Sequence, residues 1–150
     1  MCGIVIRAMR AEDIPLLAAV ERDNFSDPWS EASFEAELKN PYGITLVAET
    51  VTGVSGYLNA FLVGGNLHIN TFCVVLAQRG KGIASALMER LLEKAVSEGV
   101  EDATLEVREG NIPAQALYRK YGFIPVGVRK RFYRKPEEDA VLMKKEFIHD

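Results

Sequence analysis

The run Arg79-Gly80-Lys81-Gly82-Ile83-Ala84 follows an apolar segment and opens an amphipathic one, and it constrains the fold more than any other feature of the chain. A strand, a glycine-rich turn and a helix in this order can hold a pyrophosphate. N–H groups at a helix start have no intrahelical partner and carry the positive end of the helix dipole. Glycine lets a phosphate approach them. Taken alone, the run indicates either a phosphate site or an ordinary strand-to-helix turn.

Two common nucleotide motifs do not match this run. No Gly-Lys-Ser/Thr ends it, which excludes a P-loop. It also lacks the third glycine of the dinucleotide fingerprint, and no acidic residue closes a later strand at the usual distance. The ligand must therefore be sought among other pyrophosphate compounds.

The pattern before the run predicts two helices and four strands. Residues 4–8 read as a strand and residues 11–23 as an amphipathic helix. Ser30 is a good N-cap for a helix that ends near Lys39, with Trp29 and Phe34 placed as a hydrophobic staple. Three strands follow, at residues 44–49, 54–63 and 67–75, with a glycine turn between the last two.

The pattern after the run predicts two more helices and three strands. Apolar residues recur every four positions from Ile83 to Ala95, and Gly99 suits the end of that helix. Residues 103–108 alternate as a strand, Asn111 caps a short helix that ends at Gly122, and strands follow at 123–128 and 140–144. We expect a charged, aromatic loop at residues 129–134. The order β-α-α-β-β-β-α-β-α-β-β predicts an α/β fold, a mixed central sheet with helices on both faces.

Composition narrows the functional class. The 150 residues fit one domain, and a net charge of −3 argues against nucleic acid as the main ligand. Cys2, Cys73, His68 and His149 have no metal-ligand or disulfide spacing, so we expect no metal. Residues 1–7 do not form a signal peptide, and no apolar run approaches about 20 residues. These features predict a cytoplasmic protein that does not enter a membrane; the sequence leaves its oligomeric state open.

Together with the glycine run, three further elements resemble the GNAT acetyltransferase superfamily: the strand at 105–108, the capping Asn111 and residues 116–123. Arg79-x-x-Gly82-x-Ala84 matches its Q/R-x-x-G-x-G/A signature, and Asn111 followed by A-L-Y-x-x-x-G-F matches its other common stretch. Pro28-Trp29-Ser30-Glu31, Leu105-Glu106-Val107-Arg108 and Arg129-x-x-Phe132-Tyr133 resemble the RimI-type ribosomal-protein-alanine N-acetyltransferases. The resemblance covers nearly the whole chain. It implies acetyl transfer from acetyl-CoA to the N-terminal alanine of small-subunit ribosomal protein eighteen.

The resemblance also implies roles for individual residues. Glu106 corresponds to the general base and Tyr118 to the general acid, while Trp29 and Tyr133 line the acceptor groove. The residues implied to contact acetyl-CoA lie on the strand before the run, in the run and at the cap of the short helix: Phe72, Cys73, Val74, Arg79, Gly80, Lys81, Gly82, Ile83, Ala84, Ser85 and Asn111.

Several of these residues also have a purely structural interpretation, and Tyr133 can belong to an ordinary charged hairpin. Glu106 can be a solvated strand carboxylate, Tyr118 an aromatic at the edge of the core, and Trp29 a packing residue. We expect Cys73 to be an inert core thiol rather than a nucleophile. We expect His68 to be a strand-edge residue, with a water-relayed base as the alternative. Val75-Leu76-Ala77 replaces the Asp-Pro-type turn of many relatives, so the resemblance does not define the geometry of the loop before Arg79. Other functions remain on the same fold: a small-amine or polyamine acetyltransferase, a protein N-terminal acetyltransferase of broader specificity, and a non-catalytic CoA-binding module.

Overall fold

The computed structural model describes residues 3–148. The predicted order of elements is confirmed, with two short 3-10 turns added at Ala11–Asp13 and Leu76–Gln78. The helices are α1 (Ile14–Asn24), α2 (Glu31–Glu37), α3 (Ile83–Ser97) and α4 (Ile112–Lys120). The strands are β1 (Val5–Ala8), β2 (Gly43–Thr50), β3 (Gly53–Val63), β4 (Asn66–Val74), β5 (Asp102–Arg108), β6 (Ile124–Tyr133) and β7 (Glu138–Glu146).

The strands form one seven-stranded sheet in the order β1-β2-β3-β4-β5-β7-β6. All neighbours are antiparallel except β4 and β5, which are parallel, so the predicted mixed sheet is confirmed. The crossover between these two parallel strands is α3, as a parallel connection requires.

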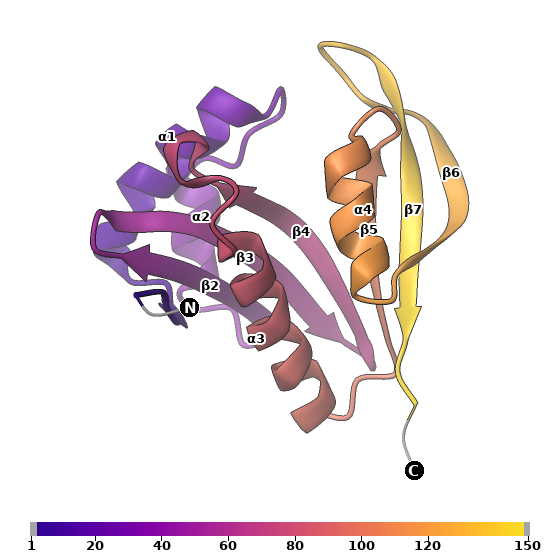
Figure 1. The fold of residues 1–150 in the computed structure, drawn as a ribbon, viewed down its shortest axis with the longest axis horizontal. Coiled ribbons are helices and arrows are strands. Elements are labelled where there is room, and N and C mark those ends of the chain that lie inside the picture. Colours follow the sequence, from indigo (N-terminus) through magenta and orange to yellow (C-terminus); the bar gives the residue numbers. More distant parts are fainter. Residues whose placement is uncertain (1–2, 149–150) are drawn as a thin grey trace.

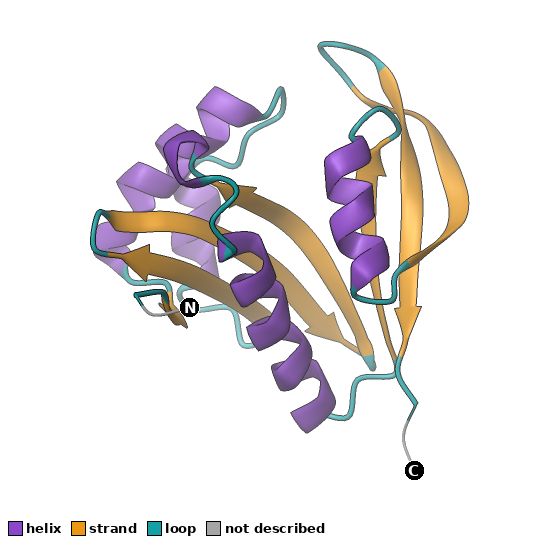
Figure 2. Ribbon diagram, in the orientation of Figure 1, coloured by secondary structure: helices purple, strands orange, loops and turns teal. Residues whose placement is uncertain are grey.

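Helices cover both faces, as the sequence predicts (Figure 2). Leu46 and Ala48 of β2 belong to the core cluster beneath α3 and α4. Val47, between them, belongs to a second cluster with the apolar side chains of α1 and α2. Alternate side chains of one strand thus feed opposite cores, which explains the nearly continuous apolar character of the central strands.

The β4–β5 contact is short. Pairing runs from Asn66 and Asp102 only as far as Ile69 and Leu105. Beyond this point the two strands diverge, so the sheet opens into a V between β4 and the unit made of α4, β5, β6 and β7 (Figure 1). The chain following β4 leads directly to the glycine run and α3.

A β-bulge in β4, just before the V, changes which face of the sheet its following side chains point to. Asn59 pairs with Thr71 but Ala60 pairs with Ile69, so Asn70 is an extra residue in β4. Ile69 lies in the cluster beneath α3 and α4, whereas Cys73 lies in the cluster beneath α1 and α2. The bulge therefore shifts the alternation of the strand by one residue.

The expected loop at residues 129–134 is wrong in its extent. β6 continues to Tyr133, and the register breaks between Arg129, opposite Ala140, and Tyr133, opposite Glu138. The Asp139 side chain holds this break, because its Oδ1 accepts from the backbone N–H of Arg131 at 2.9 Å. The sequence pattern misses the continuation because β6 is an exposed edge strand without apolar alternation at these positions.

No helix within residues 3–148 has the length and apolar character needed to cross a membrane.

Candidate active site

The edge of β4 at the V carries outward-facing backbone groups. The N–H of Val75 donates to the Ser55 carbonyl of β3 at 2.9 Å. Because backbone N–H groups alternate in direction along a strand, the N–H of Val74 points the other way, toward β5. On that side the Val74 carbonyl accepts from Arg79 Nε at 3.1 Å. The strand expected to meet the acetyl group thus turns a backbone donor toward the opening.

The three predicted cofactor residues of β4 do not share one face. Phe72 and Val74 pack against the cluster beneath α3 and α4. Cys73 points to the opposite face and is 7% exposed. Burial raises the pKa of the Cys73 thiol, which keeps it protonated at neutral pH and supports the expectation of an inert thiol.

The glycine run has the backbone geometry of an anion-binding turn. Gly80 and Gly82 have φ values of +78° and +82°, and no atom lies within 4 Å of a Cβ placed on either. α3 begins directly after Gly82, so its first N–H groups face this open space. Ile83 is buried, whereas Ala84 and Ser85 are partly exposed at the same helix end. Lys81 contacts Gln78, with Nζ and Oε1 3.4 Å apart.

Glu106 is the first residue of β5 beyond the last β4 pair. It points to the face of α1 and α2, because Leu105 and Val107 face the other core. Its Oε1 lies 2.9 Å from His68 Nε2, and its Oε2 lies 3.2 Å from Arg129 Nε. The hydrogen bond from His68 lowers the pKa of the Glu106 carboxyl, and the charge of Arg129 adds to the effect. The side chain is therefore ionised and able to accept a proton at neutral pH.

Tyr118 lies on α4, at the other face of the sheet beside the V. Its ring is 8% exposed and contacts Phe72 and Phe123, with centroids 6.3 and 6.0 Å away. Its hydroxyl makes no hydrogen bond with the rest of the described chain. Burial, and then the nearby Tyr133, raise the pKa of Tyr118, so it stays a proton donor at neutral pH. Tyr118 packs at the core edge and its hydroxyl is not committed to another described residue, while its role as general acid stays a prediction.

Tyr133, at the end of β6, links the two candidate catalytic groups. Burial and the charge of Glu106 raise the pKa of Tyr133 to about 12, and Tyr133 in turn raises the pKa of Tyr118. Its ring lies 4.4 Å from the Arg108 guanidinium. Tyr133 thus lies near enough to both Glu106 and Tyr118 for their charges to affect one another's pKa values.

Asn111 caps α4, as predicted. Its Oδ1 accepts from the N–H of Ala114 at 3.2 Å, and a proline follows in the first turn. Its contact with a cofactor stays a prediction.

Trp29 forms the predicted hydrophobic staple with Phe34, at 5.2 Å between ring centroids. Its ring also lies 6.5 Å from Phe61 of β3, and it is partly exposed. Packing is therefore one of its roles, and its place in an acceptor groove stays a prediction.

Sequence reasoning misses the carboxylate of Glu21. This side chain is 1% exposed and accepts three hydrogen bonds: from Tyr57 Oη at 2.6 Å, Thr71 Oγ1 at 2.6 Å and the Trp29 N–H at 2.9 Å. It ties the Trp29 loop to β3 and β4. The sequence signals this buried site only weakly, by an acidic residue next to the apolar face of α1.

Arg108 is a second residue that the sequence leaves unassigned. Its guanidinium donates to Ser26 Oγ at 2.9 Å and to Glu138 Oε1 at 3.1 Å. Ser26 lies in the loop after α1, whereas Glu138 opens β7. Arg108 thus joins the two loops expected to receive the acceptor.

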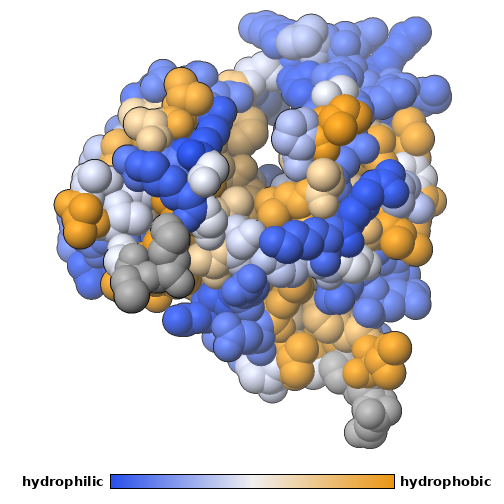
Figure 3. All heavy atoms as spheres, in the orientation of Figure 1, coloured by the Kyte–Doolittle hydropathy of each residue, from blue (hydrophilic) through white to orange (hydrophobic). Residues whose placement is uncertain are grey.

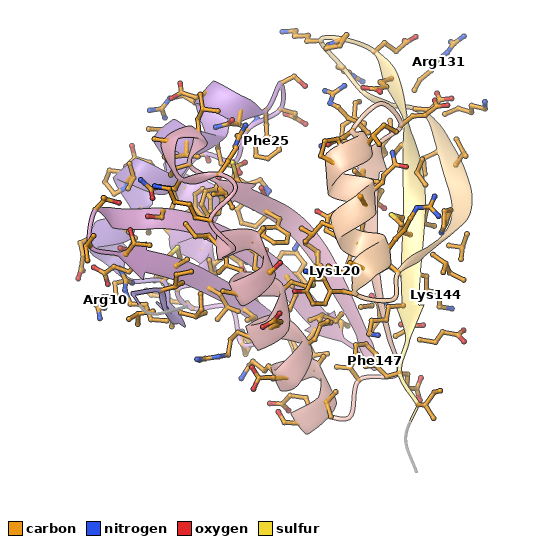
Figure 4. The ribbon with its side chains drawn as sticks, in the orientation of Figure 1. Arg10, Phe25, Lys120, Arg131, Lys144 and Phe147 are labelled. Atoms are coloured by element: carbon orange, nitrogen blue, oxygen red, sulfur yellow. The ribbon has the colours of Figure 1, made fainter. Side chains whose placement is uncertain are left out.

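Hydrophilic side chains gather over the tip of the β6–β7 hairpin, and the surface is hollowed between this tip and the α1 side (Figure 3). Arg131 lies beside the tip, and Phe25, just after α1, lies across the opening from it (Figure 4). Acidic side chains offset part of the positive charge: Lys130 contacts Asp139 at 3.3 Å and Arg131 contacts Glu137 at 3.9 Å. A basic acceptor peptide therefore meets less positive charge than the sequence suggests.

Within residues 3–148, no group of three or more His, Cys, Asp or Glu side chains is arranged to hold a metal ion. Cys2 and His149 lie outside the described residues.

Comparisons with known proteins agree with this geometry. The model of the acetyltransferase (GNAT) family matches residues 14–123. The chain is 34% identical to the N-alpha-acetyltransferase RimI of Mycobacterium tuberculosis, covering 95% of this chain and 92% of the relative. It is 30% identical to the ribosomal protein bS18-alanine N-acetyltransferase of Haemophilus influenzae, covering 93% and 96%.

A solved structure shows the same fold. The crystal structure of the ribosomal-protein-S18-alanine N-acetyltransferase from Escherichia coli superposes with a TM-score of 0.89 at 23% identity, covering 98% of this chain and 96% of that one. The resemblance drawn from the sequence motifs is thereby confirmed. With a family match across most of its length and two relatives of 30% identity or more, the chain belongs to the GNAT acetyltransferase family.

Proposed function

We propose that this chain, acting as one catalytic domain, transfers acetyl from acetyl-CoA to the N-terminal alanine of a small-subunit ribosomal protein of the bS18 type. The observation that carries the proposal is the placement of an ionised Glu106 and a protonated Tyr118 on opposite faces of the sheet beside one opening. Relatives with 30% and 34% identity bear names that describe N-terminal acetylation, which supports the same acceptor class.

The residues around the opening fit acetyl-CoA. Gly80 and Gly82 leave the start of α3 accessible to a pyrophosphate, since a Cβ on either would meet no atom within 4 Å. Phe72 and Val74 offer an apolar edge for the pantetheine, and the N–H of Val74 can polarise a carbonyl as an oxyanion hole does. The donor supplies a thioester whose carbonyl carbon is open to an amine.

The chain's own groups supply the proton transfers. Glu106 takes a proton from the α-ammonium of the acceptor, which frees the nitrogen lone pair for attack. The nitrogen forms a bond to the carbonyl carbon, and as the C–S bond breaks Tyr118 gives its proton to the sulfur. The tyrosinate then takes the second proton that the acetylated nitrogen loses, and the proton on Glu106 passes to water. No covalent enzyme intermediate is needed, which accords with the buried, protonated Cys73. An acceptor of this kind places the reaction in the cytoplasm.

The test is a peptide panel analysed by mass spectrometry. Peptides that begin Ala-Arg should gain one acetyl group on the α-amino nitrogen, whereas the same peptide with a blocked N-terminus should gain none. Turnover on spermidine without transfer to peptides would instead identify a small-amine acetyltransferase. Acetyl-CoA binding with no turnover on any acceptor would identify a non-catalytic module.

A further inference from the structure

His68 of β4 lies between two side chains of β5. Its Nδ1 is 2.7 Å from Thr104 Oγ1, and its Nε2 is 2.9 Å from Glu106 Oε1. His68 pairs directly with Thr104 across the parallel strands, and Glu106 is two residues further on the same face. The strand register therefore builds this chain of contacts, and both His68 and Glu106 are largely shielded from solvent.

The hydrogen bonds in this chain have a defined direction. An ionised Glu106 only accepts, so Nε2 of His68 carries a proton. A neutral imidazole carries this one proton only, so its Nδ1 accepts from the Thr104 hydroxyl, whereas an imidazolium donates to Thr104 from Nδ1. Thr104 Oγ1 in turn receives a hydrogen bond from Asn66 Nδ2 at 3.3 Å, and the same amide donates to Asp102 Oδ1 at 2.7 Å. A chain of hydrogen bonds thus runs from Asn66 through Thr104 and His68 to Glu106, and the Asn66 amide also holds Asp102 at its far end.

The two oxygens of Glu106 differ in their partners. Oε1 contacts His68, whose side chain is 28% exposed, whereas Oε2 contacts Arg129, whose side chain is 55% exposed. The charged or titratable groups that face Glu106 are His68 from β4 and, from β6, Arg129 and Tyr133. An exposed arginine can move aside for an incoming cation more readily than a packed histidine. Oε2 is therefore the oxygen that an acceptor ammonium can reach.

We propose that His68 is the positioning residue of the Glu106 base: its Nε2–H holds Oε1 and leaves Oε2 to take the acceptor's proton. This inference rests on the proposed function. When the N–H bond of the ammonium breaks, the proton passes to Oε2 and the electron pair stays on the attacking nitrogen. Oε1 then becomes the carbonyl oxygen of the acid and still accepts from His68. The imidazole keeps its own proton throughout, so the carboxyl group need not rotate between its two states.

Two substitutions of similar size separate positioning from packing. His68→Gln keeps an N–H close to the place of Nε2, whereas His68→Leu has no donor. We expect His68→Leu to lower kcat for an Ala-Arg peptide roughly tenfold, less than the loss of the base itself. The Kd for acetyl-CoA and the KM for the peptide should change little, and His68→Gln should recover most of kcat. The pKa of Glu106, followed by NMR of its labelled carboxyl carbon, should rise in His68→Leu and stay low in His68→Gln.

Wild-type kcat in His68→Leu, or equal losses in Leu and Gln variants that both fold, would overturn the inference. If His68→Leu does not fold, Thr104→Val and Thr104→Ser make the same comparison at the residue that contacts His68. Thr104→Val should have the lower kcat, because it removes the hydroxyl that Thr104→Ser keeps. Equal kcat values in these two variants would contradict the inference. An inactive wild-type enzyme would count against the proposed function alone. In that case the carboxyl titration still decides whether His68 controls Glu106, and an unchanged pKa in His68→Leu refutes it.

Discussion

Glu106 and Tyr118, two side chains beside the V, have pKa values that their surroundings shift in opposite directions. The donor His68 and the cation Arg129 lower the pKa of the Glu106 carboxyl. Burial among aromatic rings raises the pKa of the Tyr118 phenol above its usual range. A proton acceptor and a proton donor can therefore be present together at neutral pH, which is the arrangement that acid–base catalysis needs.

Replacing Tyr118 by Phe removes the hydroxyl and keeps the ring against Phe72 and Phe123. We expect kcat to fall by about 100-fold, in the usual range for loss of a general acid, while the Kd for acetyl-CoA stays within about twofold. Steady-state kinetics and calorimetric titration measure the two quantities. Tyr42→Phe, at an exposed tyrosine before β2, is the control and should leave both unchanged. Full activity in Tyr118→Phe would remove this residue from the mechanism.

The start of α3 is the element that we expect to hold the pyrophosphate. Gly82 has a φ of +82° directly before the helix, and Gly99 has a φ of +69° directly after its C-terminal end. At either position an added Cβ would have no atom within 4 Å, so an alanine side chain would not clash. The two glycines thus differ in position while sharing the same backbone requirement.

Gly82→Ala and Gly99→Ala form a matched pair. Both should lower the free energy of unfolding by about 1 kcal/mol, because L-residues disfavour positive φ. Only Gly82→Ala should also weaken acetyl-CoA binding, by about fivefold or more, since it disturbs the backbone that faces the phosphates. Thermal unfolding and calorimetric binding separate the two effects. Equal Kd values in the pair would place the pyrophosphate elsewhere.

Elements with a clear period could be predicted, and irregular ones could not. The spacing of four from Ile83 to Ala95 gives α3 almost to its ends. In β4 the apolar positions that face α3 change from 67 and 69 to 72 and 74, which marks the bulge at Asn70 only once the pairing is known. The hydrogen bonds of Glu21 join residues up to 50 positions apart, and a local sequence pattern cannot predict contacts between such distant residues.

At the scale of the whole molecule, two paired carboxylates tie stability to pH. Asp13, 5% exposed, accepts from Arg7 at 2.8 and 2.9 Å, and this ion pair lowers the pKa of Asp13. The pKa of Glu106 is lowered as well. A group with a depressed folded-state pKa adds stability above its unfolded pKa and loses that contribution as the pH falls through its folded pKa.

We therefore expect the free energy of unfolding to fall as the pH drops below about 4.5, where unfolded carboxylates begin to protonate. Asp13→Asn should cost about 2 kcal/mol at pH 7, since it leaves Arg7 without its buried partner, and should make the acid decline shallower. Urea unfolding across pH 3–7 measures both. An acid decline of equal slope in the two proteins would show that Asp13 carries none of it.

The family and its fold could be read from Arg79 to Ala84 and from the stretch that contains Tyr118, because these motifs are short and continuous in the chain. The contacts of His68, Arg129 and Arg108 depend on which strands lie side by side, so they needed the structure. The whole molecule is thus a GNAT acetyltransferase fold whose candidate site residues lie on both sides of one opening in the sheet.

The most direct test of the central claim compares the wild-type enzyme with Glu106→Gln on a peptide that begins Ala-Arg, following α-amino acetylation by mass spectrometry. The account predicts acetylation by the wild type, a loss of about 100-fold or more in kcat for Glu106→Gln, and acetyl-CoA binding that is the same in both. Equal kcat values in the two proteins, or no transfer to the α-amino group by the wild type, would contradict it.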